Sequence, residues 1–284
     1  MSPRLKVAVA AVLFSTGGAA IKGVAFGAWQ VAALRATLAL LTILILLPES
    51  RRGWTRRTAL VGLAYAATTL LYVQANKHTT AASAIFLQST SPLFILLLAP
   101  RLLGEHATRR DVVQMSVMGA GMVLFFLGHD AASATAPSPL LGNAMAATCA
   151  LTWALTVIGY RWLVQTRGGG SVATAAASGN LTAASIAVVA AWPFAAGHPQ
   201  DWAAVTFLGV CQLGLAYAFL ARAVPHLRAI EVSLFLAVEP VLNPIWAWLV
   251  HGERPGAPTL LGGALILGAT VLRSVMDARV PARV

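Results

Sequence analysis

Residues 28–47 read AWQVAALRATLALLTILILL, a run of apolar residues in which Arg35 is the one charge. An α-helix needs about 20 such residues to cross the hydrocarbon core of a bilayer. We count ten comparable segments along the 284-residue chain, at 5–22, 28–47, 58–77, 79–100, 109–128, 139–163, 171–195, 202–222, 226–250 and 257–276. The sequence therefore predicts an all-α, polytopic membrane protein with ten transmembrane helices.

The composition supports this reading. Of all residues, 58% are hydrophobic and 10% are charged, whereas about a quarter of the residues of a soluble domain are charged. In a soluble protein, the net charge of +11 would suggest nucleic acid as a partner. Here the basic residues stand in short gaps between apolar runs, where they orient membrane helices. We expect a lipid bilayer around the chain and no nucleic-acid partner.

The basic residues are distributed unevenly over the gaps. Of the 20 Lys and Arg residues, Lys22, Lys77 and Arg254 fall in gaps on one side and Arg35 lies within a span. The other 16 fall on the side of the N-terminus. Because cytoplasmic loops are enriched in Lys and Arg, we expect both termini in the cytoplasm and the protein in the bacterial inner membrane.

The chain contains an internal repeat. Residues 91–105 begin with Ser-Pro and end with Gly-Glu, and residues 239–253 begin with Glu-Pro and end with Gly-Glu, at a constant offset of 148. The first Gly-Glu falls in a gap predicted to be cytoplasmic and the second in a gap on the opposite side. We therefore expect two inverted five-helix repeats, 1–130 and 131–284, an arrangement typical of transporters.

These two segments, together with the glycines at 262, 263 and 268 in the last helix, resemble the drug/metabolite transporter superfamily in its EamA-type exporter branch. Within that branch the chain is most similar to exporters of aromatic amino acids, whose sixth helix carries a tryptophan that Trp153 matches. The resemblance implies ten helices around a central cavity. It also implies export of amino acids, aromatic and other neutral ones, or of related metabolites.

Several polar and aromatic residues are predicted to lie within spans. A small organic solute needs an apolar pocket with a few placed polar groups, and aromatic rings can also hold a cation. The predicted substrate-binding residues are Trp153, Tyr65, Gln88, Ser91, Gln212, Tyr217, Glu239 and Asn243.

Two charges lie near the centres of predicted helices, where each costs about 2.5–3.5 kcal/mol on insertion scales. Glu239 is either a cavity carboxylate, binding a substrate ammonium or a proton, or a structural carboxylate bonded to a neighbouring helix. For Arg35 we favour a structural or snorkelling role. Glu253, in a turn at the surface, is interpreted as structural.

Three prolines are predicted to interrupt their helices, namely Pro92, Pro240 and Pro244. A proline within a helix removes one backbone donor and leaves the carbonyl one turn earlier without its partner. These positions are either packing kinks or points at which the helix bends during gating. Because Pro92 and Pro240 are related by the repeat, we favour gating.

Other functional classes are less consistent with the sequence. An intramembrane enzyme needs a catalytic pair such as His-Glu-x-x-His, and a channel needs a filter loop or a charged ring; neither pattern occurs in the sequence. No metal-binding or cofactor motif is apparent, so no cofactor is expected, and the monomer is expected to be the functional unit. A sugar, nucleotide-sugar or drug carrier remains the alternative within the same superfamily.

The predicted topology can be tested with reporter fusions. A fusion after Ser133, in the gap between the two predicted halves, should report the periplasm, and a fusion at the C-terminus should report the cytoplasm. The 16-to-3 distribution of basic residues is the reason. If both fusions report the same compartment, the predicted topology is wrong.

Overall fold

The computed structural model describes residues 1–102, 108–127, 132–166, 170–227 and 229–278. In this part of the chain, helices are joined by turns and loops, and the only β-structure is one isolated bridge between Ser133 and Ala136. In chain order the elements are α1 (Pro3–Ser15), α2 (Gly17–Gly23), α3 (Ala28–Leu46), the 3-10 turn η1 (Pro48–Arg51), α4 (Arg56–His78), α5 (Ala81–Gln88), α6 (Ser91–Leu102), α7 (Arg109–Leu127), α8 (Pro139–Gln165), α9 (Val172–Ala191), α10 (Pro199–Thr206), the π-helix η2 (Phe207–Leu215), α11 (Ala216–Ala223), the 3-10 turn η3 (Val224–His226), α12 (Ala229–Leu236), α13 (Glu239–His251) and α14 (Ala257–Ala278).

These elements form the predicted spans. In the described residues, nine helical stretches are long and apolar enough to cross a membrane, and Ala257–Leu272 within α14 is a tenth, shorter apolar helix. Each of the ten predicted segments overlaps one of them. Four spans consist of consecutive pieces, which are α1–α2, α5–α6, α10–η2–α11 and α12–α13.

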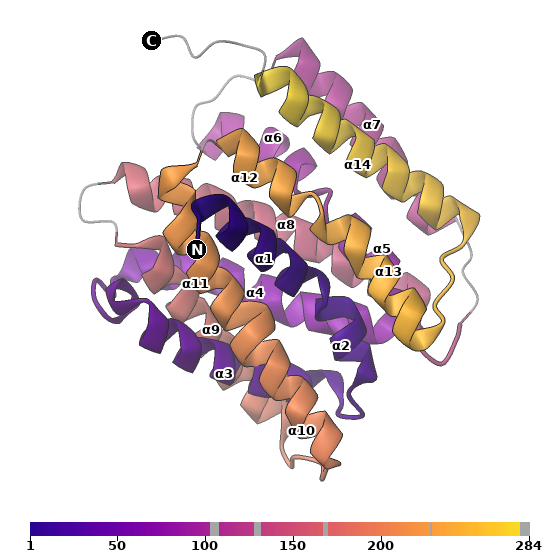
Figure 1. The fold of residues 1–284 in the computed structure, drawn as a ribbon. Coiled ribbons are helices and arrows are strands. Elements are labelled where there is room, and N and C mark those ends of the chain that lie inside the picture. The colour runs from indigo at the N-terminus through magenta and orange to yellow at the C-terminus, as the bar shows by residue number, and fades with distance from the viewer. Residues whose placement is uncertain (103–107, 128–131, 167–169, 228, 279–284) are drawn as a thin grey trace.

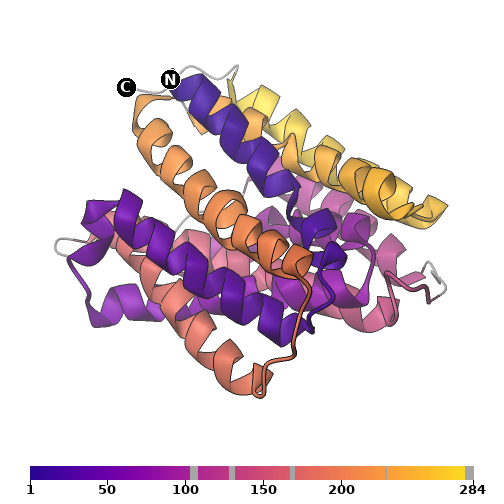
Figure 2. The ribbon, with the colours of Figure 1, turned by 60° about the horizontal axis from the view of Figure 1, so that its bottom comes forward.

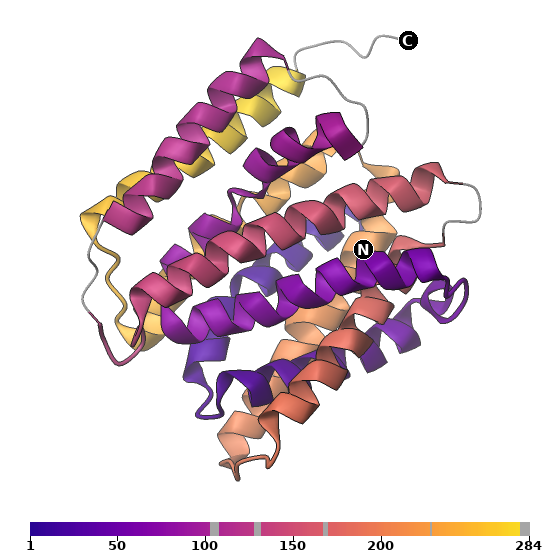
Figure 3. The ribbon, with the colours of Figure 1, turned by 180° about the vertical axis from the view of Figure 1, so that it is seen from behind.

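The spans pack as an antiparallel bundle. The start of α1 and the end of α14 lie at the same end (Figures 1 and 2), which we call the proximal end; the opposite end is the distal end. Helix α4 packs against α8 and α9, and α7 lies beside α14 at one edge (Figures 1 and 3).

Gly121 and Gly262 allow α7 and α14 to approach closely, because a Cβ added at Gly121 would lie 2.9 Å from the Gly262 carbonyl oxygen. Small residues permit such close approach of membrane helices.

Two spans break at repeat-related positions. Helix α5 ends at Gln88 and α6 begins at Ser91, while α12 ends at Leu236 and α13 begins at Glu239. The two-residue turns, 89–90 and 237–238, differ by the same offset of 148 as the sequence repeat. The opposite orientation of the two halves stays a prediction, and Gly104 and Glu105 lie outside the described residues.

Two of the three prolines follow helix breaks, as expected, and the third does not. Pro92 and Pro240 are each the second residue of the helix that follows the break, where the missing N–H is not needed by the helix. Pro244 lies inside α13, which continues through it. The expectation that Pro244 interrupts its helix is therefore wrong, because its neighbours keep helical geometry despite the one lost hydrogen bond.

The distal end is closed by a buried ion pair. Lys22 of α2 lies 2.9 Å from the Glu253 carboxylate, and both side chains are almost fully buried. The Lys22 ammonium also donates to the carbonyls of Thr79 and Thr135, and the Glu253 carboxylate accepts from the Ala81 N–H at the start of α5. These contacts join α2, α5 and the segment after α13. Glu253, expected in a turn at the surface, is buried in this seal.

The buried pair makes a stability prediction. Lys22→Met leaves the Glu253 carboxylate buried without its counter-charge, which should destabilise the protein by about 3–5 kcal/mol. The double variant Lys22→Met/Glu253→Gln removes both charges and keeps an oxygen for the Ala81 N–H, so it should recover much of this loss. Thermal unfolding of the purified protein in detergent measures both effects.

The control for this experiment is Arg4→Met. Arg4 pairs with Glu231 at 2.7 Å, but its side chain is 68% exposed. An exposed pair contributes about 0–1 kcal/mol, so this variant should unfold close to the wild type. Equal unfolding temperatures for the Lys22 single and double variants would refute the role assigned to the pair.

Candidate functional site

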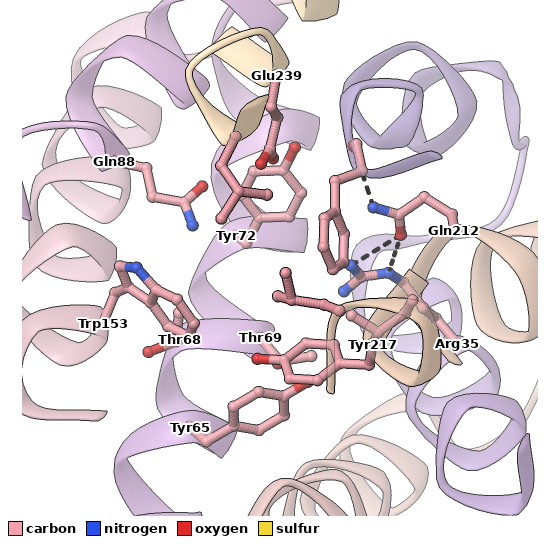
Figure 4. A pocket seen from close by; sticks show the side chains of 14 residues that line it. Arg35, Tyr65, Thr68, Thr69, Tyr72, Gln88, Trp153, Gln212, Tyr217 and Glu239 are labelled. Carbon is pink, nitrogen blue, oxygen red and sulfur yellow. Dashed lines mark hydrogen bonds between the residues drawn. The ribbon is translucent and has the colours of Figure 1, made fainter. Parts of the chain in front are cut away.

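A cavity of about 250 Å³ lies where seven of the spans meet (Figure 4). Its walls come from α1, α3, α4, α5, α8, the η2–α11 span and the α12–α13 span. The lining residues are Phe14, Arg35, Tyr65, Thr68, Thr69, Tyr72, Gln88, Trp153, Gln212, Leu213, Tyr217, Leu220, Leu236 and Glu239. We call this space the central cavity.

One wall of the central cavity is aromatic. The ring of Tyr217 meets the ring of Tyr65 edge to face, with centroids 5.8 Å apart, and it meets the ring of Phe14 at the same distance. Trp153 projects from α8 on another side (Figure 4). Edge-to-face packing fixes the positions of these rings, so the cavity presents a rigid aromatic surface to whatever enters it.

Helix α4 contributes four side chains to the cavity, Tyr65, Thr68, Thr69 and Tyr72. Their spacing of i, i+3, i+4 and i+7 places them on one face of the helix. Of these four residues, only Tyr65 was predicted from the sequence to line the site. The periodicity of polar and aromatic residues on an otherwise apolar helix is the signal that predicts the other three.

Arg35 does not snorkel, which was one of the two roles favoured for it. Its side chain is buried, with the residue 3% exposed, and it lines the central cavity instead of extending to the membrane surface. Its Nε and Nη2 donate to the Gln212 side-chain oxygen at 3.2 and 3.0 Å. The prediction of snorkelling is therefore wrong, because a partner and a polar cavity are available at depth. Glu239 also lines this cavity (Figure 4).

A second cavity of about 600 Å³ adjoins the first. The two share Gln88, Trp153, Leu236 and Glu239 as lining residues. The second cavity extends between α6 and α12 to residues near the proximal ends of their spans, such as Leu227 and Val271. The combined space therefore reaches from the middle of the bundle toward the proximal end.

The predicted site residues are placed in three groups. Six line the central cavity: Trp153, Tyr65, Gln88, Gln212, Tyr217 and Glu239. Ser91 lines the second cavity, beside Pro92 and Pro240. Asn243 lines neither cavity; it is fully buried on the distal side, where its amide nitrogen donates to the Tyr72 hydroxyl at 3.2 Å.

Contacts of α1 and α2 with α13 close the cavity on its distal side. The His251 imidazole nitrogen lies 2.8 Å from the Ala19 carbonyl oxygen, and the Trp246 indole donates to the Ser15 hydroxyl at 3.0 Å. The Lys22–Glu253 pair lies beyond them. Access to the central cavity is thus asymmetric, with a path toward the proximal end and a seal at the distal end.

The described residues hold no group of three or more His, Cys, Asp or Glu side chains able to bind a metal ion. The cavity offers aromatic rings, amides, hydroxyls and one charge of each sign. This arrangement can bind a small polar molecule non-covalently.

Comparison with known proteins agrees with this description. The chain is 27% identical over 218 residues to a protein of Pseudomonas aeruginosa (strain UCBPP-PA14) named pseudopaline exporter CntI, covering 72% of this chain and 69% of that one. It is 25% identical to an uncharacterized transporter of Archaeoglobus fulgidus, covering 74% and 73%. It is 31% identical to an uncharacterized protein of Pseudomonas aeruginosa (strain PAO1 and its equivalents), covering 91% of both chains.

A solved crystal structure matches 99% of both chains with a TM-score of 0.66 at 21% sequence identity, which shows the fold alone. The family model described as EamA-like transporter family matches residues 3–127 and 140–275, one segment in each half of the chain. These matches cover most of the sequence. The chain is therefore a multi-pass membrane protein that belongs to the EamA-like transporter family.

Proposed function

We propose that this protein is a secondary transporter of the bacterial inner membrane that exports amino acids, aromatic and other neutral ones, or related metabolites by alternating access. The observation that carries the proposal is the central cavity, lined by aromatic and polar side chains and closed at the distal end only. With both termini in the cytoplasm, as the basic residues predict, the cavity faces the cytoplasm. An exporter loads its substrate from that side.

The size and surface of the cavity support an amino-acid-sized substrate. Its volume of about 250 Å³ corresponds to roughly eight water molecules at about 30 Å³ each. Aromatic rings offer apolar contact, and amides and hydroxyls fix orientation. The name of the pseudopaline exporter supports export as the direction, and the resemblance to exporters of aromatic amino acids supports the substrate class.

The monomer is proposed as the functional unit. The alternative, a sugar, nucleotide-sugar or drug carrier, uses the same fold. A panel of labelled compounds distinguishes these possibilities.

Transport by the purified protein in proteoliposomes tests the proposal. We expect uptake of labelled neutral or aromatic amino acids above protein-free liposomes. Trp153→Ala should lower this transport about tenfold, which corresponds to about 1.4 kcal/mol of lost contact. The matched control is Trp202→Ala, because Trp202 is 45% exposed near the distal end and lies outside the cavity.

Two results would contradict this proposal. Uptake of sugars or drugs with no uptake of amino acids would support the alternative carrier. Equal transport by the Trp153 and Trp202 variants, at equal protein content, would show that Trp153 does not contact the substrate.

The helix breaks before Pro92 and Pro240 are proposed as the bending points of alternating access. Pro92 cannot donate to the Gln88 carbonyl, nor Pro240 to the Leu236 carbonyl. Replacing each proline by alanine supplies the missing N–H and favours a continuous helix. Because the two breaks are repeat-related, the two variants should shift the balance between inward- and outward-open states in opposite directions. Each substitution can shift the ratio of inward- to outward-open states only by the difference between its effects on the free energies of the two states.

Cysteine labelling from each side of the membrane measures this shift. One probe cysteine is placed on the proximal side of the central cavity and another on its distal side, in a protein that lacks Cys149 and Cys211. If Pro92→Ala and Pro240→Ala change labelling in the same direction, or leave it unchanged, both prolines serve packing only.

A further inference from the structure

Arg35 is a buried cation that forms no direct ion pair with the described residues. In the part of the chain that the structure describes, the carboxylates of Glu231 and Glu253 pair with Arg4 and Lys22, and none pairs with Arg35. Its contacts are neutral, namely the Gln212 amide oxygen and the ring of Tyr72, whose centroid lies 5.8 Å from the guanidinium carbon. A charge at this depth is costly unless a partner compensates it. Here that partner is missing.

The guanidinium keeps donors for such a partner. Arginine has five N–H donors in a planar fork. Gln212 receives one from Nε and one from Nη2. Nη1 makes no hydrogen bond to the described residues, and Arg35 lines the central cavity (Figure 4). A fork of this kind matches the two oxygens of a carboxylate.

Gln212 holds the guanidinium in this orientation. It lies within the π-helix η2, and its amide nitrogen donates to the Phe14 carbonyl at 3.2 Å. Single π-helical turns are frequent at functional sites. Gly209 lets η2 approach α3 closely, because a Cβ there would lie 3.0 Å from the Arg35 carbonyl oxygen. Gln212 is therefore a positioning residue for Arg35.

Glu239 supplies the opposite charge on another side of the same cavity (Figure 4). It forms no ion pair with Arg35. The space between a guanidinium and a separate carboxylate fits a molecule that carries both an anionic and a cationic group. Such a molecule would satisfy both buried charges at once.

We propose that Arg35 binds the carboxylate of a zwitterionic substrate in the central cavity while Glu239 faces the substrate's ammonium group. The inference rests on the proposed function and deepens it: it selects α-amino acids and similar zwitterions over amines, neutral solutes and sugars. Trp153 and the tyrosine rings then contact the side chain of the substrate.

Competition assays with matched compounds test this inference. Transport of labelled L-phenylalanine and L-leucine is measured in proteoliposomes, with the unlabelled amino acid or its carboxamide as competitor. The carboxamide keeps the amine and the side chain and lacks the carboxylate. In the wild type, the amino acid should compete about tenfold to a hundredfold better than its carboxamide, the range expected for hydrogen bonds to a charged group. In the wild type, 3-phenylpropionate, which lacks the amine, should compete less well than L-phenylalanine. In Glu239→Gln this difference should disappear.

The decisive variant is Arg35→Gln. It should bring the acid and its carboxamide to equal potency while the carboxamide keeps its wild-type potency, a result that loss of folding cannot produce. Arg35→Lys, which keeps the charge and lacks the fork, should retain part of the preference and serves if Arg35→Gln does not fold. The matched control is Arg52→Gln, an exposed arginine outside the cavity, which should behave as the wild type.

The outcomes separate the two proposals. If the wild type transports amino acids and Arg35→Gln keeps the preference for the acid, the role of Arg35 is wrong and the proposed function stands. The same holds if both competitors weaken equally in Arg35→Gln and Arg35→Lys, because Arg35 is then structural. If the wild type transports no amino acid, the proposed function fails and this inference fails with it.

Discussion

The lipid environment requires that every backbone N–H and C=O of a span find a partner inside the protein. This constraint explains why apolar runs of about 20 residues become helices. It also explains where the helices can be interrupted. The breaks at 89–90 and 237–238 are flanked by residues of the two cavities, and the π-helix η2 contributes Gln212 and Leu213 to the central one. Irregular backbone thus lies where a cavity, and not lipid, surrounds it.

The same environment explains two different arrangements of buried charge. Lys22 and Glu253 are in direct contact, and backbone groups of Thr79, Thr135 and Ala81 complete their surroundings. Arg35 and Glu239 are also within the bundle, but a cavity separates them. A direct pair needs no further ligand and suits a seal. A separated pair lowers the stability of the empty protein and is consistent with a site that a zwitterion completes.

Hydropathy alone located the spans, because the bilayer imposes a minimum length on each helix. The cavity was harder to predict. Polar and aromatic residues at mid-span are conspicuous, which is why the sequence indicated Trp153, Tyr65 and Glu239. Tyr72 was not predicted to line the cavity, and Arg35 was predicted to have another role. Helix α3 is apolar around most of its circumference, so its sequence does not show which face meets the cavity.

Lys22 shows a second limit of sequence reasoning. A lysine next to a gap is usually a solvated end of a span, and here it is buried in the distal seal. An ionic seal has a consequence for alternating access. A buried pair contributes little net stability compared with apolar residues of similar volume, and water solvates both charges once the two groups separate. An apolar seal of the same size would stabilise the closed state more, so opening it would cost more free energy. In the proposed alternating-access cycle this end must open, and a seal built from Lys22 and Glu253 would specify the closed geometry while keeping the free-energy difference between the closed and open states small.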